Sequence, residues 1–167
     1  ETFMGAVIDG GSHARITTRI QKAKEDAHAQ IIHGGKSWTD PGWFVEPTVI
    51  EVSDPKHALM RDELFGPVLT VFVYADAEWE QTLKLIDATS DYALTASIFC
   101  VDRKALLQAE TELANPAGNL YINTKLTCAV VGQQPFGGSR ASGTNDKAGS
   151  WMNLLRWTSP RVIKESY

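Results

Sequence analysis

The feature that most restricts the fold is an alternation of apolar runs and amphipathic segments between residues 68 and 123. Three short runs rich in apolar and β-branched residues are predicted strands: Val68–Tyr74, Leu94–Val101 and Gly118–Asn123. Two segments between them have helical apolar spacing and are predicted helices: one with Trp79, Leu83 and Ile86 on one face, and one over Arg103–Leu113. Strands that are apolar on both faces need cover on both sides, which parallel sheets with right-handed crossover helices provide. The pattern therefore predicts an α/β fold with an open, doubly wound parallel sheet.

The regions before this alternation are less regular. Ser12 is a predicted N-cap for an amphipathic helix with four inward positions, Ile16, Ile20, Ala23 and Ala27. We expect this helix to end with the apolar pair at residues 31–32 and the glycine turn at 34–35. The segment Gly42–Ile50 is expected to be extended and interrupted by a proline, which cannot donate to a ladder. Asp76 is the predicted cap of the helix that follows the first strand.

The composition is that of an ordinary globular domain. The 167 residues are 43% hydrophobic and 22% charged. The net charge is -4 with acidic and basic residues interspersed, which argues against a nucleic-acid partner, since phosphates need a basic stripe. No apolar run approaches the roughly 20 residues that cross a bilayer, so no membrane segment is expected. The two cysteines favour a reducing compartment over a disulfide scaffold.

The chain begins at Glu1 with no recognisable signal or transit segment. Patterned sequence starts within a few residues of this point. We therefore expect the chain to be a fragment or processed piece of a longer protein.

The segment from Thr124 to Gly149 is the expected ligand-binding loop, because doubly wound sheets bind ligands beyond the carboxyl ends of their strands. It is long for a connection, and its glycines allow unusual dihedrals and close approach to a ligand: Gly132, Gly137, Gly138 and Gly143. Their spacing matches neither the phosphate loop nor the dinucleotide fingerprint. A solvent-exposed loop with glycine turns remains an alternative at this point.

The other residues that often carry chemistry have plainer interpretations. The histidines lack the spacing of metal ligands, so no metal site is expected: His13, His28, His33 and His57. Cys100 is interpreted as an inert core residue inside a strand, and Cys128 as a small side chain in a turn. Three tryptophans are interpreted as core or interface anchors: Trp43, Trp151 and Trp157.

Three motifs, in order, resemble those of the aldehyde dehydrogenase family. Glu63-Leu64-Phe65-Gly66-Pro67 is similar to the family's Glu-x-Phe-Gly-Pro motif, and the segment at 42–47 resembles its Gly-Tyr-Phe-x-x-Pro motif. Residues 134–138 and 142–143 resemble its late Pro-Phe-Gly-Gly and Ser-Gly elements. The resemblance runs from end to end. It implies that residues 1–158 are the C-terminal part of an aldehyde dehydrogenase catalytic domain and that residues 159–167 form a C-terminal strand for oligomer contact.

Further segments resemble one branch of that family, the Δ1-pyrroline-5-carboxylate dehydrogenases. They are residues 131–138, 142–147 and 156–160. Enzymes of this branch oxidise L-glutamate γ-semialdehyde to L-glutamate with NAD in proline breakdown. The resemblance therefore implies an oxidoreductase that uses NAD and an aldehyde substrate with an α-carboxylate.

The resemblance also implies roles for individual residues. Glu63 would bind the ribose hydroxyls on the nicotinamide side of NAD, and Phe65 would pack near the nicotinamide. The backbone N–H groups of an anchor loop would receive the substrate's α-carboxylate: Thr127, Cys128 and Ala129. Phe136 would pack on the aliphatic part of the substrate.

Cys128 departs from the pattern, because the family commonly has glycine there. If that glycine has a positive φ, a side chain costs on the order of 1 kcal/mol or more. The side chain would also narrow the substrate pocket.

The family's nucleophilic cysteine, glutamate base and main cofactor-binding domain lie upstream of the matched segment. Neither Cys100 nor Cys128 matches the nucleophile motif, so we expect no catalytic residue in this chain and no activity of the chain alone. The partners implied are the remainder of the enzyme and further copies of it, with residues 162–163 in the contact strand. The compartment would be the mitochondrial matrix in a eukaryote and the cytoplasm in a bacterium. Two alternatives remain: an aldehyde dehydrogenase for another substrate, and a non-catalytic binding or assembly module that kept the fold.

Overall fold

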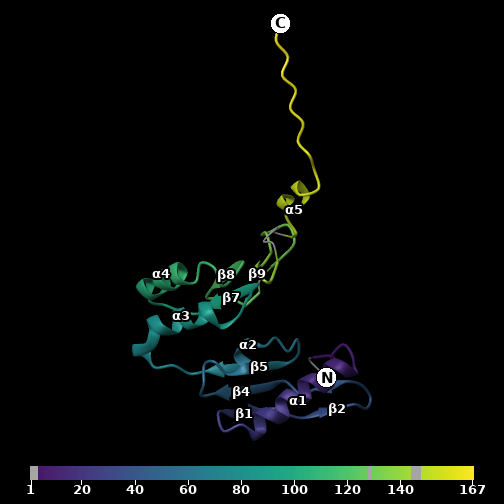
Figure 1. Ribbon diagram of the computed structural model, residues 1–167, viewed down its shortest axis with the longest axis vertical. Coiled ribbons are helices and arrows are strands. Elements are labelled where there is room, and N and C mark those ends of the chain that lie inside the picture. Colours follow the sequence, from purple (N-terminus) through teal and green to yellow (C-terminus); the bar gives the residue numbers. More distant parts are fainter. Residues whose placement is uncertain (1–3, 128, 144–147) are drawn as a thin grey trace. The chain divides into compact units, whose positions relative to one another are not determined.

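A computed structural model describes residues 4–127, 129–143 and 148–167 (Figure 1). Cys128 and residues 144–147, which carry part of the predicted branch motif, lie outside the described residues. The chain divides into two compact units, Glu1–Trp79 and Glu80–Tyr167.

The first unit is built on a three-stranded sheet with the order β1-β4-β5. Strand β4 pairs antiparallel with β1 and parallel with β5, so the sheet is mixed. Strands β2 and β3 form a separate antiparallel pair. The elements are α1 (Gly10–Glu25), β1 (Ala29–His33), β2 (Ser37–Trp38), β3 (Phe44–Val45), β4 (Thr48–Val52), α2 (Ala58–Arg61), β5 (Val68–Phe72) and the 3-10 helix η1 (Asp76–Glu78).

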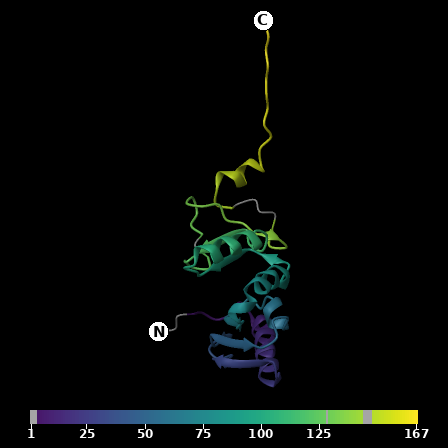
Figure 2. The ribbon, with the colours of Figure 1, turned by 90° about the vertical axis from the view of Figure 1, so that its left-hand side faces the viewer.

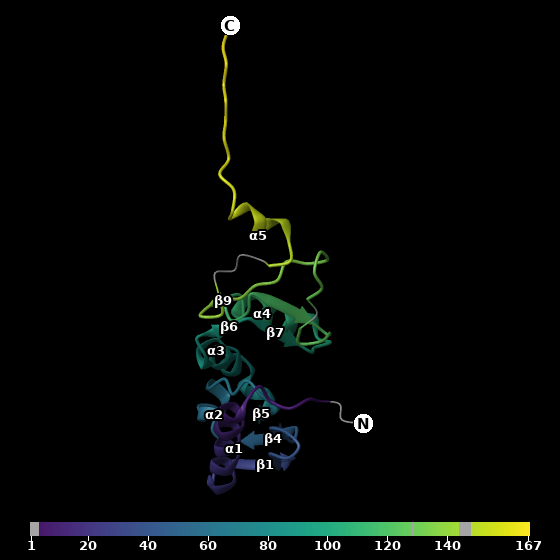
Figure 3. The same cartoon turned by 90° about the vertical axis from the view of Figure 1, so that its right-hand side faces the viewer.

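Helix α1 packs along this sheet and supplies much of the core of the unit (Figure 3). Three of the four predicted inward positions, Ile16, Ile20 and Ala23, are buried, which confirms the amphipathic pattern within the helix. The fourth, Ala27, lies beyond the end of the helix and is exposed, so that part of the prediction is wrong. The three buried residues lie in a cluster with buried residues of the strands, of α2 and of the loop after α2: Val45, Ile50, Val52, Leu59 and Leu64. The helix is thereby fixed to the sheet along its length.

The boundaries of α1 differ from the prediction. Asp9 is the N-cap rather than Ser12, because the Asp9 carboxylate accepts the Ser12 backbone N–H at 2.7 Å. The helix ends at Glu25, and residues 31–32 belong to β1. A half-buried edge strand with two adjacent isoleucines does not show the alternation that would have identified it.

The second unit has two small sheets, shown with their helices in Figures 1 and 2. Strands β7 and β8 pair in parallel, with Thr95 opposite Asn119 and Ile98 opposite Ile122. Strands β6 and β9 pair antiparallel. The elements are α3 (Trp79–Thr89), β6 (Tyr92–Ala93), β7 (Thr95–Ile98), α4 (Arg103–Glu112), β8 (Asn119–Ile122), β9 (Ser139–Arg140) and α5 (Trp151–Leu155).

The predicted succession of strand, helix, strand, helix and strand between residues 68 and 123 is confirmed, as is the α/β class. The parallel pairs are β4–β5 and β7–β8. Asp76 is not a cap: Ala75 precedes η1, and the Glu78 carboxylate accepts the Ala75 N–H at 3.3 Å.

Cys100 is not a core residue of a strand. Strand β7 ends at Ile98, and the half-buried Cys100 follows it, with its Sγ donating to the Asp102 carbonyl at 3.3 Å. Trp43, Trp151 and Trp157 are all exposed, so the core interpretation is wrong for all three, and the interface alternative stays a prediction. Residues 159–167 contain neither helix nor strand within this chain, and Val162 and Ile163 are exposed. Their role in an oligomer stays a prediction.

Candidate functional site

The loop between α2 and β5 presents two of the predicted site residues. Glu63 and Phe65 are exposed, and the intervening Leu64 is buried in the core of the first unit. Phe65 has a φ of 54° and an 80% exposed side chain, an unusual combination for a large apolar residue. The loop therefore buries one residue and holds a carboxylate and an aromatic ring in solvent.

Tight packing fixes the backbone directly after Phe65. A Cβ on Gly66 would lie 2.4 Å from the Ile16 Cδ1 atom of α1, so any larger residue there would have to displace the end of the Ile16 side chain. The Pro67 carbonyl accepts the Thr48 N–H at 2.9 Å, which joins the loop to the start of β4. The Glu-x-Phe-Gly-Pro motif thus has a structural explanation for its glycine as well as two exposed side chains.

An exposed carboxylate beside a flat aromatic ring fits a nucleoside group. The two oxygens of Glu63 can accept hydrogen bonds from vicinal hydroxyls, and the ring of Phe65 offers a face for a planar heterocycle.

A second group of predicted residues follows β8 in the second unit. Asn123 ends the strand with a φ of 52°, and its amide donates to the Cys100 carbonyl at 2.9 Å and accepts the Cys100 N–H at 2.8 Å. The Ser97 hydroxyl donates to the Thr124 carbonyl at 2.8 Å. These bonds fasten the start of the loop to the end of β7. Further along, Thr127 and Ala129 are exposed.

Phe136 lies in a segment that is joined to the start of β8. The Asn119 amide donates to the Pro135 carbonyl at 2.9 Å and accepts the Gly137 N–H at 3.0 Å, so it binds the backbone on both sides of Phe136. The Phe136 N–H donates to the Ala148 carbonyl at 3.0 Å. The phenylalanine is half-buried and held in place by β8.

Other residues of the same motif pack equally closely. Gln134 donates from its amide to the Tyr121 hydroxyl at 3.1 Å. A Cβ on Gly118 would lie 1.8 Å from the Gly137 carbonyl oxygen, so only glycine allows this approach of the two backbones. The late Pro-Phe-Gly-Gly element is therefore an extension of the β8 framework and not a free loop.

A cavity of about 520 Å³ adjoins this segment. It is lined by residues of the predicted loop and of α5, among them Gln134, Pro135, Trp151 and Leu154. The lining combines amide groups with apolar side chains, as small-molecule sites commonly do.

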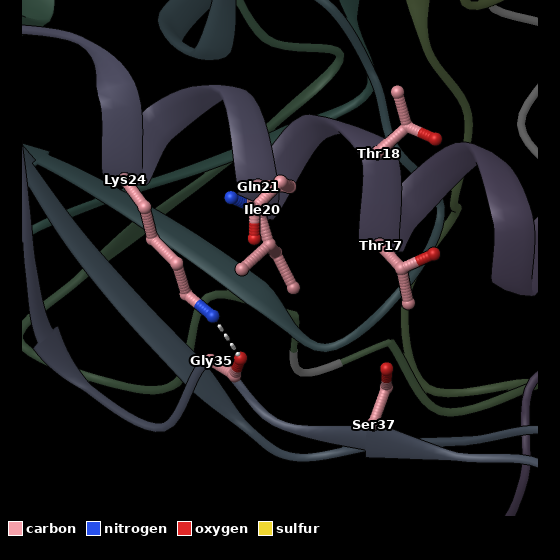
Figure 4. A pocket seen from close by; sticks show the side chains of 7 residues that line it. All are labelled: Thr17, Thr18, Ile20, Gln21, Lys24, Gly35 and Ser37. Atoms are coloured by element: carbon pink, nitrogen blue, oxygen red, sulfur yellow. Dashed lines mark hydrogen bonds between the residues drawn. The ribbon is translucent and has the colours of Figure 1, made fainter.

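A smaller, polar cavity of about 310 Å³ lies in the first unit, between α1 and the strand β2 (Figure 4). Two of its polar side chains have partners: Lys24 donates to the Gly35 carbonyl at 2.9 Å, as Figure 4 shows, and the Thr17 hydroxyl donates to the His13 carbonyl at 2.8 Å. None of the residues predicted as site residues lines it.

The described ranges of the chain contain neither a metal-binding cluster nor a membrane-spanning helix. No group of three or more histidine, cysteine or acidic residues there could hold a metal ion. Within those same ranges, no helix has both the length and the apolar character required to traverse a membrane.

A model of the aldehyde dehydrogenase family matches residues 1–163. The chain belongs to this family.

Similar proteins from different organisms carry the same enzyme name. The chain is 58% identical over 166 residues to a mitochondrial Δ1-pyrroline-5-carboxylate dehydrogenase of Dictyostelium discoideum, and 49% identical over 166 residues to the one of Homo sapiens. Each match covers 99% of this chain and 30% of the relative, so the chain spans about a third of the curated relatives' length. The predicted resemblance to the aldehyde dehydrogenase family is confirmed.

A solved structure gives the same result. The chain matches the Mycobacterium tuberculosis Δ-pyrroline-5-carboxylate dehydrogenase bound with NAD at a TM-score of 0.84 and 49% identity, covering 96% of this chain and 29% of that one. The α/β class of the chain is therefore that of known aldehyde dehydrogenases.

The predicted site residues fall into two groups. Glu63 and Phe65 lie together in the first unit, and Thr127, Ala129 and Phe136 lie in the second. Cys128 lies outside the described residues. Sequence reasoning missed Asn119 and Asn123, although amide residues near both ends of an apolar strand were a signal.

Proposed function

We propose that this chain is the C-terminal portion of an NAD-dependent dehydrogenase that oxidises L-glutamate γ-semialdehyde, formed from Δ1-pyrroline-5-carboxylate, to L-glutamate in proline catabolism. The observation that carries the proposal is the 49–58% identity, over 99% of the chain, to relatives named for that activity. The family's nucleophile and base belong to the remainder of the enzyme, so this chain contributes binding and not the covalent step.

Glu63 and Phe65 would hold NAD. NAD supplies the hydride acceptor of the reaction, and the Mycobacterium tuberculosis relative is described as bound with it. The Glu63 carboxylate would accept hydrogen bonds from the ribose hydroxyls on the nicotinamide side, and Phe65 would pack near the nicotinamide. Both side chains are exposed on a backbone that is fixed by Leu64 and Gly66, which supports this role.

The loop after β8 would bind the amino-acid end of the substrate. Backbone N–H groups of Thr127, Cys128 and Ala129 would receive the α-carboxylate, and Phe136 would pack on the aliphatic chain. The fastening of this region to β7 and β8 by Asn123 and Asn119 supports a preorganised loop.

The remaining parts of the proposal concern the whole protein. We infer that residues 1–158 form part of the catalytic domain and that residues 159–167 contact another copy in a homo-oligomer. The names of the eukaryotic relatives place them in mitochondria, and the matrix would be the compartment if this chain is eukaryotic.

The test is NAD reduction by the intact enzyme, meaning the full-length protein that contains this chain. We expect NADH formation that requires L-glutamate γ-semialdehyde, and none from the 167-residue chain alone. Glu63→Gln should raise the KM for NAD by roughly tenfold, since a weakened acceptor contributes less binding. Glu51→Gln, at an exposed position of β4, is the matched control and should leave that KM unchanged. An intact enzyme that forms no NADH with this substrate contradicts the proposal.

A further inference from the structure

Two arginines of α1 contact the loop that carries Glu63 and Phe65. Arg15 donates from Nη2 to the Leu64 carbonyl at 3.3 Å. Arg19 forms an ion pair from Nη2 to the Asp62 Oδ2 atom at 2.8 Å. The two arginines are one helical turn apart and therefore lie on the same face of α1.

Along the loop, the residues that the two arginines contact alternate with the two residues that are predicted to bind the cofactor. Arg19 holds the residue before Glu63, and Arg15 holds the residue between Glu63 and Phe65. Glu63 and Phe65 themselves extend into solvent. The arginines thus bind the backbone and flanking side chain of the loop and leave its two functional side chains free.

The loop conformation needs such support. A left-handed backbone at a non-glycine residue such as Phe65 is strained, and it persists only when the surrounding structure holds it. Helix α1 is a firm attachment point because Ile16 and Ile20 on it are fully or almost fully buried. A loop tied to this helix keeps the exposed carboxylate and ring in one geometry before a ligand arrives.

We propose that Arg15 and Arg19 are positioning residues, which fix the Asp62–Phe65 segment so that Glu63 and Phe65 are preorganised for the cofactor. This inference rests on the proposed function of the loop. Without the two contacts, the loop occupies its binding geometry for only part of the time. The apparent affinity for NAD then falls by that fraction.

The experiment compares steady-state kinetics of the intact enzyme and of variants at the ion pair. Arg19→Ala and Asp62→Asn should each raise the KM for NAD about fivefold and leave kcat within about twofold. The double variant should be no worse than the more severe single one, because both remove the same contact. Arg15→Ala should act in the same direction, and Arg15→Lys should recover most of the loss because it keeps a donor for the Leu64 carbonyl.

Arg61→Ala is the matched control. Arg61 pairs with the other oxygen of Asp62 at 2.9 Å, but it belongs to α2 and does not connect the loop to α1. We expect the KM of the Arg61→Ala enzyme for NAD to stay at the wild-type value. The affinity for NAD is also measured directly by fluorescence titration without the aldehyde, which is a readout independent of turnover.

The outcomes separate the possibilities. A wild-type enzyme that neither binds NAD nor oxidises the semialdehyde overturns the proposed function. An active wild-type enzyme whose Arg19→Ala and Asp62→Asn variants keep the wild-type KM and affinity for NAD overturns the positioning role alone. A fall in kcat with an unchanged KM means fewer folded molecules, and it also overturns the positioning role. If Arg19→Ala does not fold, Asp62→Asn and Arg19→Met, which also removes the ion pair, decide the question by the same criterion.

Discussion

Asn119 shows how one side chain controls a predicted substrate contact. Its amide donates to the Pro135 carbonyl and accepts the Gly137 N–H, so it binds the backbone on both sides of Phe136. Asn119→Ala removes both bonds and should cost about 1–3 kcal/mol of stability because two half-buried backbone groups lose their partner. With Phe136 less well placed, the KM for the semialdehyde should rise by roughly tenfold while the KM for NAD stays constant.

The measurement is kinetics of the intact enzyme with each substrate varied in turn. Asn115→Ala is the control, since Asn115 is exposed and its backbone carbonyl, not its side chain, accepts from Ser139. An Asn119→Ala enzyme with a wild-type KM for the aldehyde would show that Phe136 does not contact the substrate.

Asp26, just after α1, gives the first unit a dependence on pH. The pKa of its carboxyl lies below the ordinary value of 3.8, mainly because Oδ1 accepts the His28 backbone N–H, and also because His57 hydrogen-bonds to the carboxylate. A lowered pKa in the folded state means that the ionised group stabilises the fold above pH 3.8. This stabilisation is lost as the pH falls through the folded pKa.

We expect the urea midpoint of the wild-type enzyme to fall more steeply than that of Asp26→Asn between about pH 4 and about pH 2. The measurement is a set of urea unfolding curves at several pH values for both proteins. Parallel pH profiles would show that Asp26 is not linked to folding.

Among the elements, two glycines that lie just before strands of parallel pairs differ in the atoms that an added side chain would meet. A Cβ on Gly66 would meet the end of the Ile16 side chain, which can move, whereas a Cβ on Gly118 would meet the backbone of Gly137. We predict that Gly118→Ala destabilises the protein by about 1–3 kcal/mol and by more than Gly66→Ala does. Urea unfolding of the two variants measures this, and a larger loss for Gly66→Ala would contradict the packing described for β8.

The elements that could be predicted from sequence are those whose pattern reflects burial. Helix α1 follows from apolar residues at the helical period, and strands β5, β7 and β8 follow from short runs rich in apolar and β-branched residues. The two-residue strands β6 and β9 could not be predicted, because two residues show no period and their pairing depends on distant contacts.

The same division applies to the candidate site. Glu63, Phe65 and Phe136 follow from motifs, since their chemistry is local in sequence. The contacts of Arg15 and Arg19 could not be predicted, because each joins segments that only the fold brings together. The cap at Asp9 was missed for a smaller reason, a choice between two good capping residues near the start of α1.

At the scale of the whole molecule, the last nine residues carry the prediction of an oligomer. Val162 is 90% exposed and Ile163 is 75% exposed. Two such adjacent apolar side chains favour contact with another surface. Deleting residues 159–167 should lower the mass of the intact enzyme measured by light scattering, with secondary structure by circular dichroism as the control. An unchanged mass would exclude this segment from the oligomer contact.

We propose that the enzyme containing this chain recognises an aldehyde by its α-carboxylate. The proposal is tested by the ratio of kcat/KM for L-glutamate γ-semialdehyde to kcat/KM for a straight-chain aldehyde that lacks amino and carboxylate groups. We expect a ratio above about a hundredfold, because backbone N–H groups of the Thr127–Ala129 anchor loop would be left without a partner by the simple aldehyde. A ratio near one would contradict it.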